Sequence, residues 1–276
     1  MSTVILDNGG YNIKIGTNND RGPRSIPNSI VKSKNERKRV FVAQEQEECT
    51  DKFSLFYVRP IEKGYVTNWD AQQKIWEKAF SALDVETTNS RIVYTDNNYL
   101  IPALPDLTNE IFFEHFGFTD VCKASSSTFI AEHSFHVRKE RCACVIDVGF
   151  SWTTIACFVD GLLIQESVIR IDVGGKALTN KLKDWISYRQ LNVSEETYVI
   201  NECKEDLCYV ALDFDENMKN AKKKMENNNV VKRYTMPDFQ TTFRGIVKEI
   251  QEPHDPAIPS IHLGVERFAI PEILFK

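Results

Sequence analysis

Val4-Ile5-Leu6-Asp7-Asn8-Gly9-Gly10 forms an apolar run that ends in an aspartate and two glycines. Three consecutive apolar residues suit a strand that is buried on both faces, and glycine permits a tight turn or a close backbone approach. Tyr11, Ile13 and Ile15 then alternate with polar residues, as a returning partner strand does. The stretch therefore predicts a β-hairpin with an aspartate beside its turn.

The same plan occurs again at Cys144-Val145-Ile146-Asp147-Val148-Gly149, which is followed by Trp152-Thr153-Thr154-Ile155. Asp7 and Asp147 lie 140 positions apart, and the same offset separates Gly9 from Gly149. A period that long indicates duplication rather than a solenoid. We therefore expect two domains built on one plan.

Both predicted turns suit phosphate binding. Glycine lets backbone N–H groups approach an anion, and a concave row of such groups binds phosphate. The neighbouring carboxylates can share the water shell of a Mg²⁺ ion, which gives up its waters reluctantly. Either turn alone is typical of an ordinary hairpin, because Asp and Gly are common turn residues. The recurrence of both turns in register favours phosphate binding.

The composition is that of a globular protein. The 276 residues are 42% hydrophobic and 26% charged, which is enough for two domains with their own cores. The start of the chain lacks the basic and apolar regions of a signal peptide, and the apolar runs are too short to span a bilayer. The net charge of −5 argues against a nucleic-acid coat, although residues 32–39 form a local basic patch.

The cysteines and histidines predict no structural metal site. The seven cysteines contain no CxxC pair, and several lie in apolar runs, which is typical of buried free thiols in a reducing compartment. His133 and His136 have no accompanying ligand pattern and are typical of a solvated helix face.

Periodicity and turn residues predict the remaining elements. The polar run that extends to about residue 51 is expected to be an exposed loop or lobe with little core. Asn68 is expected to cap a helix. Helices are expected at residues 69–80, 107–116, from 125 onward, after Gly174-Gly175-Lys176 and at 195–212, strands at 91–94 and 162–171, and loops at 219–229 and 253–259.

The glycine pair before one of these helices has two readings. A helix that begins at glycine can bind an anion through its free N–H groups. Alternatively, Gly174 and Gly175 form an ordinary capped turn.

Six separated motifs resemble actin and the actin-related proteins, in the same order and over nearly the whole chain. Three segments at residues 187–191, 237–239 and 268–273 are most similar to the actin-related protein 6 subfamily, whose members are nuclear subunits of remodellers that exchange histone variants. Counting the repeated Asp-x-Gly hairpin once, the six motifs are that hairpin and residues 59–64 (RPIEKG), 66–70 (VTNWD), 174–179 (GGKALT), 204–214 (KEDLCYVALDF) and 266–275 (ERFAIPEILF).

This resemblance implies an α/β fold shared with Hsp70 and sugar kinases, in which two duplicated domains enclose a nucleotide cleft. The small domain would be residues 1–128 and the large domain residues 129–276. Chains of the family continue past the final motif, so we expect the C-terminal part of the large domain to be missing and apolar surface to be left uncovered. Such a surface favours aggregation or requires a partner.

By position, the resemblance also implies ATP or ADP with Mg²⁺ as cofactor. Asp7 and Asp147 match carboxylates that hold the metal through water, and Lys14 matches a phosphate-contacting lysine. The other matched cofactor-binding residues are Asn8, Gly9, Gly10 and Gly149 in the phosphate turns, and Gly175, Lys204 and Glu205 around the purine and ribose.

Departures from the family argue against catalysis. Actin has Ser-Gly where this chain has Gly10-Tyr11, and a second acidic residue where this chain has Phe150. The water-orienting glutamine of actin falls within residues 125–128, and its histidine position is Thr154. Hydrolysis requires a positioned water, so a site that keeps only the metal carboxylates should bind without turnover.

The leading hypothesis is a non-catalytic, nuclear and partly cytoplasmic subunit of a histone-exchanging remodeller. Its partners would be the remodeller ATPase and accessory subunits, with weak or indirect nucleosome contact and no membrane contact. One alternative is an active ATPase or phosphotransferase of the wider superfamily. Another is a cytoskeletal polymer-former, which the short polar stretch at residues 32–51 disfavours because it does not resemble the longer filament-contacting lobe of actin.

Overall fold

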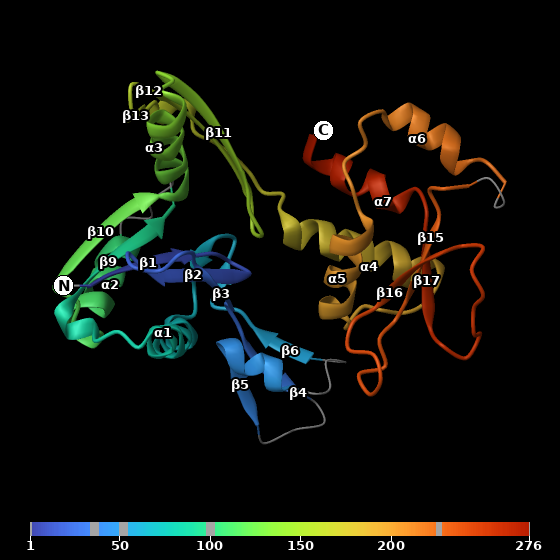
Figure 1. Cartoon of the computed structure of the whole chain (residues 1–276), viewed down its shortest axis with the longest axis horizontal. Coiled ribbons are helices and arrows are strands. Elements are labelled where there is room, and N and C mark those ends of the chain that lie inside the picture. Colours follow the sequence, from blue (N-terminus) through green and yellow to red (C-terminus); the bar gives the residue numbers. More distant parts are fainter. Residues whose placement is uncertain (1, 34–38, 50–54, 98–102, 225–227, 276) are drawn as a thin grey trace. The chain divides into compact units, whose positions relative to one another are not determined.

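The computed structural model describes residues 2–33, 39–49, 55–97, 103–224 and 228–275. These residues form two compact units (Figure 1). The first consists of Met1–Val31, Val40–Glu48 and Tyr57–Gly174, and the second of Lys32–Arg39, Cys49–Phe56 and Gly175–Lys276. The domain boundary predicted between residues 128 and 129 falls inside the first unit, and that division of the chain stays a prediction.

The first predicted hairpin is present in the first unit. Strand β1 (Ser2–Asn8) pairs antiparallel with β2 (Asn12–Thr17), which places Leu6 opposite Ile15. The hairpin belongs to a five-stranded sheet in the order β10-β9-β1-β2-β3, in which β9 is parallel to both β1 and β10. The added strands are β3 (Arg24–Pro27), β9 (Ser90–Asp96) and β10 (Asp120–Ser125).

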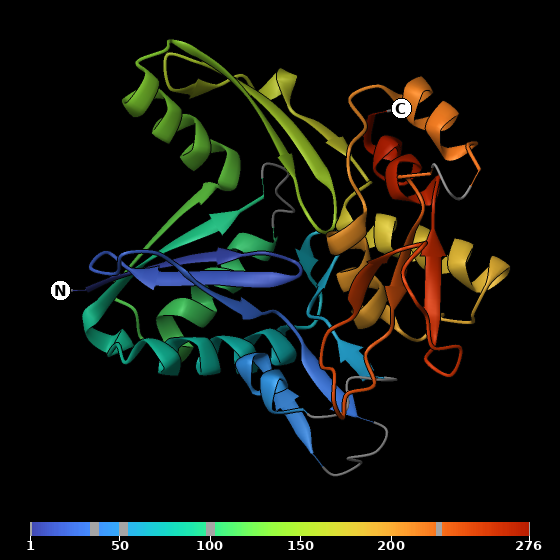
Figure 2. The same ribbon diagram turned by 45° about the vertical axis from the view of Figure 1, so that its right-hand side comes forward.

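Helix α1 (Trp69–Leu83) runs alongside this sheet and supplies its core (Figure 2). The Asn68 side chain accepts a hydrogen bond from the Ala71 N–H at 3.1 Å, which confirms the predicted N-cap. Trp76 is fully buried, and its ring lies 5.0 Å from that of Phe112. The predicted helix at residues 107–116 is α2 (Ala103–Glu110) continued by a π-helical turn, Ile111–His115.

The polar stretch after β3 contains more structure than its composition predicts. It forms β4 (Ile30–Ser33), β5 (Val40–Val42) and a 3₁₀ helix, Ala43–Glu48. Most of its few apolar residues are buried, and Phe41 is completely buried. The expectation of an exposed loop with little core is therefore wrong. Residues 34–38 of the basic patch lie outside the described part. The strands that follow are β6 (Leu55–Val58), β7 (Ile61–Glu62) and β8 (Tyr65–Val66).

The second predicted hairpin is also present, as β11 (Cys142–Val148) and β12 (Thr153–Val159), with Ile146 opposite Ile155. The strand expected over residues 162–171 is broken. It becomes β13 (Leu162–Leu163), a 3₁₀ turn (Gln165–Ser167) and β14 (Ile169–Ile171), and both strands pair with β12.

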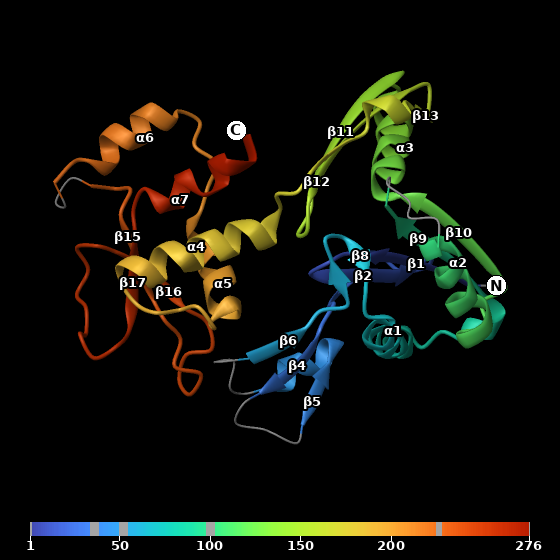
Figure 3. The same cartoon turned by 180° about the vertical axis from the view of Figure 1, so that it is seen from behind.

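Helix α3 (Ser126–Arg138), predicted to open near residue 125, lies beside this sheet (Figures 1 and 3). It is capped by Ser125, whose hydroxyl accepts a hydrogen bond from the Thr128 N–H. Ala131 packs with Val145 and Phe158 on one face of the sheet. The other face is open, because Ile146 is 62% exposed and Ile169 is 54% exposed.

The cysteines of the described chain are free, as predicted, but most of them are not buried. Cys142 and Cys144 lie on the open face of β11 and are exposed, because strand alternation directs them away from the core under α3. Only Cys49 and Cys203 are buried. His133 and His136 lie on α3 with their residues exposed, as expected of a solvated helix face.

The second unit contains four helices among its described residues and a three-stranded antiparallel sheet in the order β16-β15-β17. Its core includes Leu182, Ile200 and Phe268. The elements are α4 (Gly175–Arg189), α5 (Thr197–Leu207), α6 (Phe214–Ala221), β15 (Lys232–Thr235), β16 (Ile246–Glu249), β17 (Ser260–Leu263), α7 (Glu266–Ala269) and a 3₁₀ turn, Pro271–Phe275.

Two predicted bounds in this unit are wrong. The helix expected at residues 195–212 ends at Leu207, because Arg267 donates to the Leu207 carbonyl at 2.9 Å and the Tyr209 N–H bonds to the Arg267 carbonyl. The loop expected at 219–229 begins inside α6, which Asp213 caps through the Glu216 N–H, and residues 225–227 of that loop are not described. The loop at 253–259 is confirmed.

In the part of the chain that the structure describes, every helix is too short or too polar to cross a bilayer.

Candidate functional site

The two acidic turns line one pocket in the first unit. Its volume is about 440 Å³, and both Asp7 and Asp147 are among its lining residues. The sequence predicted that these carboxylates share a crevice, and the structure brings them to one. Strand β1 supplies Asp7 and β11 supplies Asp147, each at the end that leads into its turn. The pocket is completed by residues 95–97 at the end of β9 and by Ser126 at the start of α3.

Each carboxylate is oriented by a hydroxyl. Thr95 Oγ1 donates to one Asp7 oxygen at 2.8 Å, and Ser126 Oγ donates to Asp147 at 2.8 Å. Lys14 lies opposite Asp7 in the β1–β2 register, and its Nζ is 3.3 Å from the second Asp7 oxygen. Within the described residues, Asp7 accepts from Thr95 and Lys14, and Asp147 accepts from Ser126, so each carboxylate keeps lone pairs for metal-bound water.

This donor set fits a hydrated Mg²⁺ ion. Magnesium keeps several of its waters and is held by few direct carboxylates. Among the described residues there is no cluster of three or more acidic, histidine or cysteine side chains that could enclose an ion. Asp7 and Asp147 are the residues that would hold such an ion through its waters, and this role stays a prediction.

The first turn requires glycine at Gly9, and the two turns come close together at Gly10. A Cβ on Gly9 would lie 2.5 Å from the Asn12 carbonyl, and one on Gly10 would lie 2.7 Å from Ser151 Oγ in the other turn. Gly149 behaves differently, because its N–H already donates to the Trp152 carbonyl at 2.9 Å. That N–H closes the turn, so any phosphate contact at Gly149 would be steric rather than a hydrogen bond.

Asn8, predicted to bind cofactor, lines the pocket, but the polar atoms of its side chain are hydrogen-bonded to the core. Its Oδ1 accepts from Trp76 Nε1 at 3.2 Å and from Asn28 Nδ2 at 3.4 Å, and its Nδ2 donates to Gln72 Oε1 at 3.4 Å. Asn28 also donates to the Gly9 carbonyl at 2.8 Å. Asn8 and Asn28 therefore anchor the first turn to α1.

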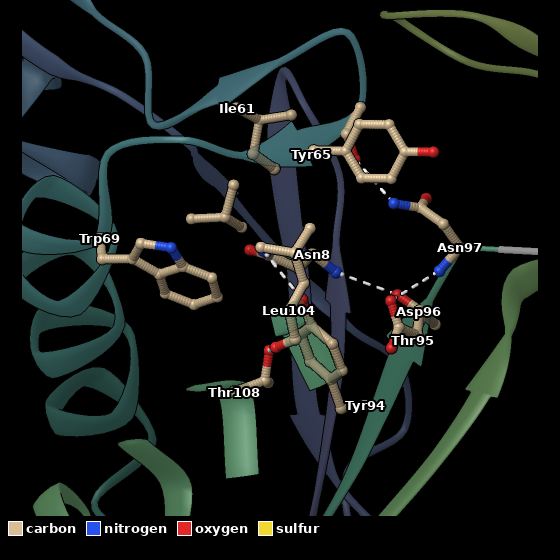
Figure 4. Close-up of a pocket in the computed structure, with 12 residues that line it drawn as sticks. Asn8, Ile61, Tyr65, Trp69, Tyr94, Thr95, Asp96, Asn97, Leu104 and Thr108 are labelled. Carbon is tan, nitrogen blue, oxygen red and sulfur yellow. Dashed lines mark hydrogen bonds between the residues drawn. The ribbon is translucent and has the colours of Figure 1, made fainter. Parts of the chain in front are cut away.

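A smaller chamber (Figure 4) shares Asn8 and residues 95–97 with the lining of the pocket. It measures about 40 Å³, which is room for one to a few waters. Asn97 closes it by donating to the Gly64 carbonyl at 2.8 Å. Burial raises the pKa of the Tyr94 hydroxyl, so that the hydroxyl stays protonated. The chamber suits ordered water around the first turn.

Two of the positions at which the chain departs from actin, Tyr11 and Phe150, pack against each other. The rings of Tyr11 and Phe150 lie 5.0 Å apart, and Arg59 lies 4.9 Å from each ring centroid. Thr154 is buried in β12. Ser125, the N-cap of α3, shares hydrogen bonds with the hydroxyls of Ser127 and Thr128. The groups at the predicted water-orienting positions are thus hydroxyls engaged in the fold.

The predicted purine and ribose residues lie together in the second unit. Lys204 Nζ donates to Thr179 Oγ1 and Asn201 Oδ1, both at 3.0 Å, and approaches the Gly175 carbonyl at 3.4 Å. Burial lowers the pKa of Lys204, while Glu205 opposes the shift. Glu205 is exposed and accepts from Asn201 at 2.7 Å. Lys204 therefore joins α4 to α5, and Glu205 is the more accessible of the two.

Sequence reasoning missed Thr95, Asn28 and Ser126. Thr95 follows an apolar strand just as Asp7 does, and β9 lies parallel to β1. Polar residues at the carboxyl ends of neighbouring parallel strands are a usual sign of a ligand site. Asn28 and Ser126 carry no comparable local signal.

A model of the actin family matches the chain over residues 1–276. The chain belongs to the actin family. The predicted α/β actin-like fold with its repeated hairpin is therefore confirmed.

Among its relatives in the family are proteins from animals and fungi. The chain is 70% identical over its whole length to an actin-like protein of Caenorhabditis elegans, of which it covers 66%. It is 37% identical to actin-related protein 6 of Drosophila melanogaster, covering 72% of that protein. It is 34% identical to actin-like protein ARP6 of Cryptococcus neoformans, covering 61%. The chain thus spans about two thirds of the length of these relatives.

Proposed function

We propose that this actin-related chain is a non-catalytic subunit of a nuclear, partly cytoplasmic remodelling complex that exchanges histone variants. In this proposal it binds ATP or ADP with Mg²⁺ as a structural ligand. The observation that carries the nucleotide part is the pocket of about 440 Å³ that both acidic turns line. Pockets of about 300–1,000 Å³ are usual for small-molecule ligands.

The residues of the pocket have separate roles in this proposal. Asp7 and Asp147 orient the water shell of the metal, and Thr95 and Ser126 hold those carboxylates in place. Lys14 supplies a positive charge in the lining of the pocket. Magnesium, when bound, neutralises phosphate charge, so the chain itself needs few cations there.

The same pocket supports binding without hydrolysis. Among the lining residues that the structure describes, the acids are Asp7, Asp96 and Asp147, and none is a histidine or glutamine. Asp96 accepts from the Asn97 N–H, and the other two are assigned to the metal. Because phosphoanhydride hydrolysis depends on an oriented water, turnover should be negligible.

Isothermal titration with MgADP and MgATP tests the nucleotide part. We expect one site per chain, and Asp147→Asn should weaken binding by at least about tenfold because it removes a charge that faces the metal. Asp120→Asn is a matched control, because Asp120 is an exposed partner of Arg91 away from the pocket. Equal affinity of the two variants would contradict the assignment of Asp147.

The remodeller part is supported by the names of two relatives, both called actin-related protein 6 or ARP6. Affinity purification of the tagged chain from nuclear extract, followed by mass spectrometry, tests it. We expect a remodeller ATPase and its accessory subunits at stoichiometric levels. Recovery of cytoskeletal proteins alone, or of filaments that grow with concentration, would overturn this part in favour of a polymer-forming role.

A further inference from the structure

Two arginines of the first unit stack on aromatic rings beside the candidate pocket. Arg59 lies between β6 and β7, and its guanidinium carbon is 4.9 Å from the ring centroid of Tyr11 and 5.0 Å from that of Tyr57. The same guanidinium carbon lies 4.9 Å from the ring centroid of Phe150, which is at the tip of the β11–β12 turn. This one side chain therefore touches both acidic turns.

Arg170 makes a second contact with the β11–β12 turn, through the ring of Trp152. It belongs to β14, and its guanidinium carbon is 3.5 Å from the ring centroid of Trp152 and 5.5 Å from that of Tyr65. Arg170 also donates to the Lys63 carbonyl at 3.3 Å, and its Nε is held by Asp172 at 2.7 Å. Its side chain is only 18% exposed.

The contacts of Arg59 and Arg170 run in opposite directions between the β7–β8 hairpin and the sheet of the second acidic turn. Arg59 precedes the β7–β8 hairpin and reaches Phe150 of the second acidic turn, whereas Arg170 comes from the sheet of that turn and reaches Tyr65 and the Lys63 carbonyl. Between them, the Trp152 ring rests on the backbone of Gly64, where a Cβ would lie 2.5 Å from the ring. Gly64 has a φ of +75°, so no other residue type suits this position.

Guanidinium–aromatic stacking is well suited to such a contact. The planar group keeps its charge while it stacks, and partial desolvation strengthens its attraction to the ring face. Burial lowers the pKa of Arg59, but arginine remains charged at any physiological pH. The contact therefore needs no anionic ligand to complete it.

We propose that these two stacks form an arginine clasp, made of Arg59 with Tyr11 and Phe150 and of Arg170 with Trp152 and Tyr65. Arg59 joins the two acidic turns directly, and Arg170 ties the second turn to the β7–β8 hairpin. Together these contacts hold the turns at a fixed separation without help from a nucleotide. It is a positioning device for the pocket, and it rests on the proposed function only for the identity of the ligand. The nucleotide then enters a preformed site and does not have to draw the turns together.

Hydrogen–deuterium exchange tests the clasp on the full chain, through peptides that cover residues 8–13 and 148–154. In the unliganded wild-type protein, both turns should exchange within about twofold of their rates under saturating MgADP. In the double variant Arg59→Ala with Arg170→Ala, unliganded exchange of both turns should be at least about tenfold faster. Saturating MgADP should restore the slow rates.

Three further variants sharpen the result. Arg59→Lys keeps the charge but loses the planar face, so it should behave like Arg59→Ala rather than like wild type. Arg91→Ala is the matched control, because this arginine forms an exposed pair with Asp120 and should leave both turns unchanged. Phe150→Leu is a milder change that removes the ring and keeps an apolar side chain, and it serves if the double variant fails to fold.

Two outcomes would overturn the clasp. The first is a wild-type protein whose unliganded turns exchange about tenfold faster than its liganded turns. The second is a folded clasp variant, with normal exchange in β9, whose turns exchange as slowly as those of wild type. A failure of MgADP to bind would count against the proposed function alone, because the comparison of unliganded wild type with unliganded variants still decides the clasp.

Discussion

Asn8 illustrates how a residue of a ligand motif can serve the core instead. Asn8→Ala removes the acceptor for the indole N–H of Trp76, which is fully buried. Leaving a buried donor unpaired costs about 1–3 kcal/mol, so we expect the free energy of unfolding to fall by about 2 kcal/mol. Urea denaturation of the purified chain measures this change.

Nucleotide affinity separates the two roles of Asn8. If its side chain only anchors the turn, Asn8→Ala should weaken MgADP binding less than Asp147→Asn does. A variant with normal stability and no binding would show instead that Asn8 contacts the ligand.

Asp238 predicts a pH dependence of stability. Its carboxylate accepts from the Thr241 hydroxyl at 2.6 Å and from the N–H groups of Thr242, Gln240 and Thr241, and these bonds hold its pKa well below the usual range. The folded state therefore favours the charged form. The resulting stabilisation should be complete above the unfolded-state pKa of about 4 and lost as the pH falls towards the folded-state value.

Comparison of wild type with Asp238→Asn measures this effect. The variant should be less stable than wild type at neutral pH, and the difference should shrink as the pH is lowered below about 4. Asp120→Asn serves as a control at an exposed surface position. A stability difference that grows on acidification would contradict the assigned hydrogen bonds.

At the scale of the elements, the packing of α4 against α5 depends on Lys204. Its ammonium group joins Thr179 on α4 to Asn201 on α5, with both distances 3.0 Å. Lys204→Met keeps the length of the side chain but removes the donors and leaves two buried polar side chains without this partner. We expect about 2 kcal/mol of destabilisation, since hydrogen bonds from charged groups contribute about 1.5–3 kcal/mol.

The control for this element is Lys181→Met on α4, because Lys181 lies near Trp185 and takes no part in the network. Thermal unfolding of both variants, followed by helical circular dichroism, separates them. Equal melting temperatures would mean that Lys204 does not join the helices.

Elements with a strong local pattern could be predicted, and contacts between distant segments could not. The two hairpins follow from apolar runs that end in Asp and Gly, and α1 follows from its apolar spacing and its Asn68 cap. By contrast, α6 has a polar sequence and begins because Asp213 caps it. The end of α5 is set by Arg267, which lies 60 residues beyond the Leu207 carbonyl that it binds.

The residues of the candidate site also divide into those with a local sequence pattern and those placed by contacts between distant segments. Asp7 and Asp147 could be predicted because each ends a recognisable strand. Thr95 ends an apolar strand as Asp7 does, but its place beside Asp7 depends on the parallel pairing of β9 with β1, which no local pattern predicts. The stacking of Tyr11, Arg59 and Phe150 was also beyond prediction, because none of these side chains carries a local signal for it.

For the whole molecule, the open face of the β11–β12–β14 sheet should govern behaviour in solution. Ile146 and Ile169 are 62% and 54% exposed, and Val148 between the turn and Ile146 is 54% exposed. Contiguous apolar surface favours association. Replacing Ile146 and Ile169 by Thr should therefore lower concentration-dependent light scattering, while the Thr side chains keep the β-branched shape that strands prefer.

Val4→Thr serves as a contrasting control for replacement by Thr at a buried position. Val4 is fully buried in β1, so its replacement should destabilise the fold. Unchanged light scattering of the Ile146→Thr, Ile169→Thr protein would mean that this face does not drive association.

At the scale of the whole molecule, the central proposal is that the two acidic turns bind a magnesium nucleotide that the chain does not hydrolyse. The most direct measurement is the fate of ATP bound to the purified chain in the presence of Mg²⁺, followed by chromatography of the protein-bound nucleotide over several hours. We predict that the nucleotide is retained and remains ATP. Release of phosphate at a steady rate that Asp147→Ala abolishes, or recovery of protein without nucleotide at saturating ATP, would contradict the account.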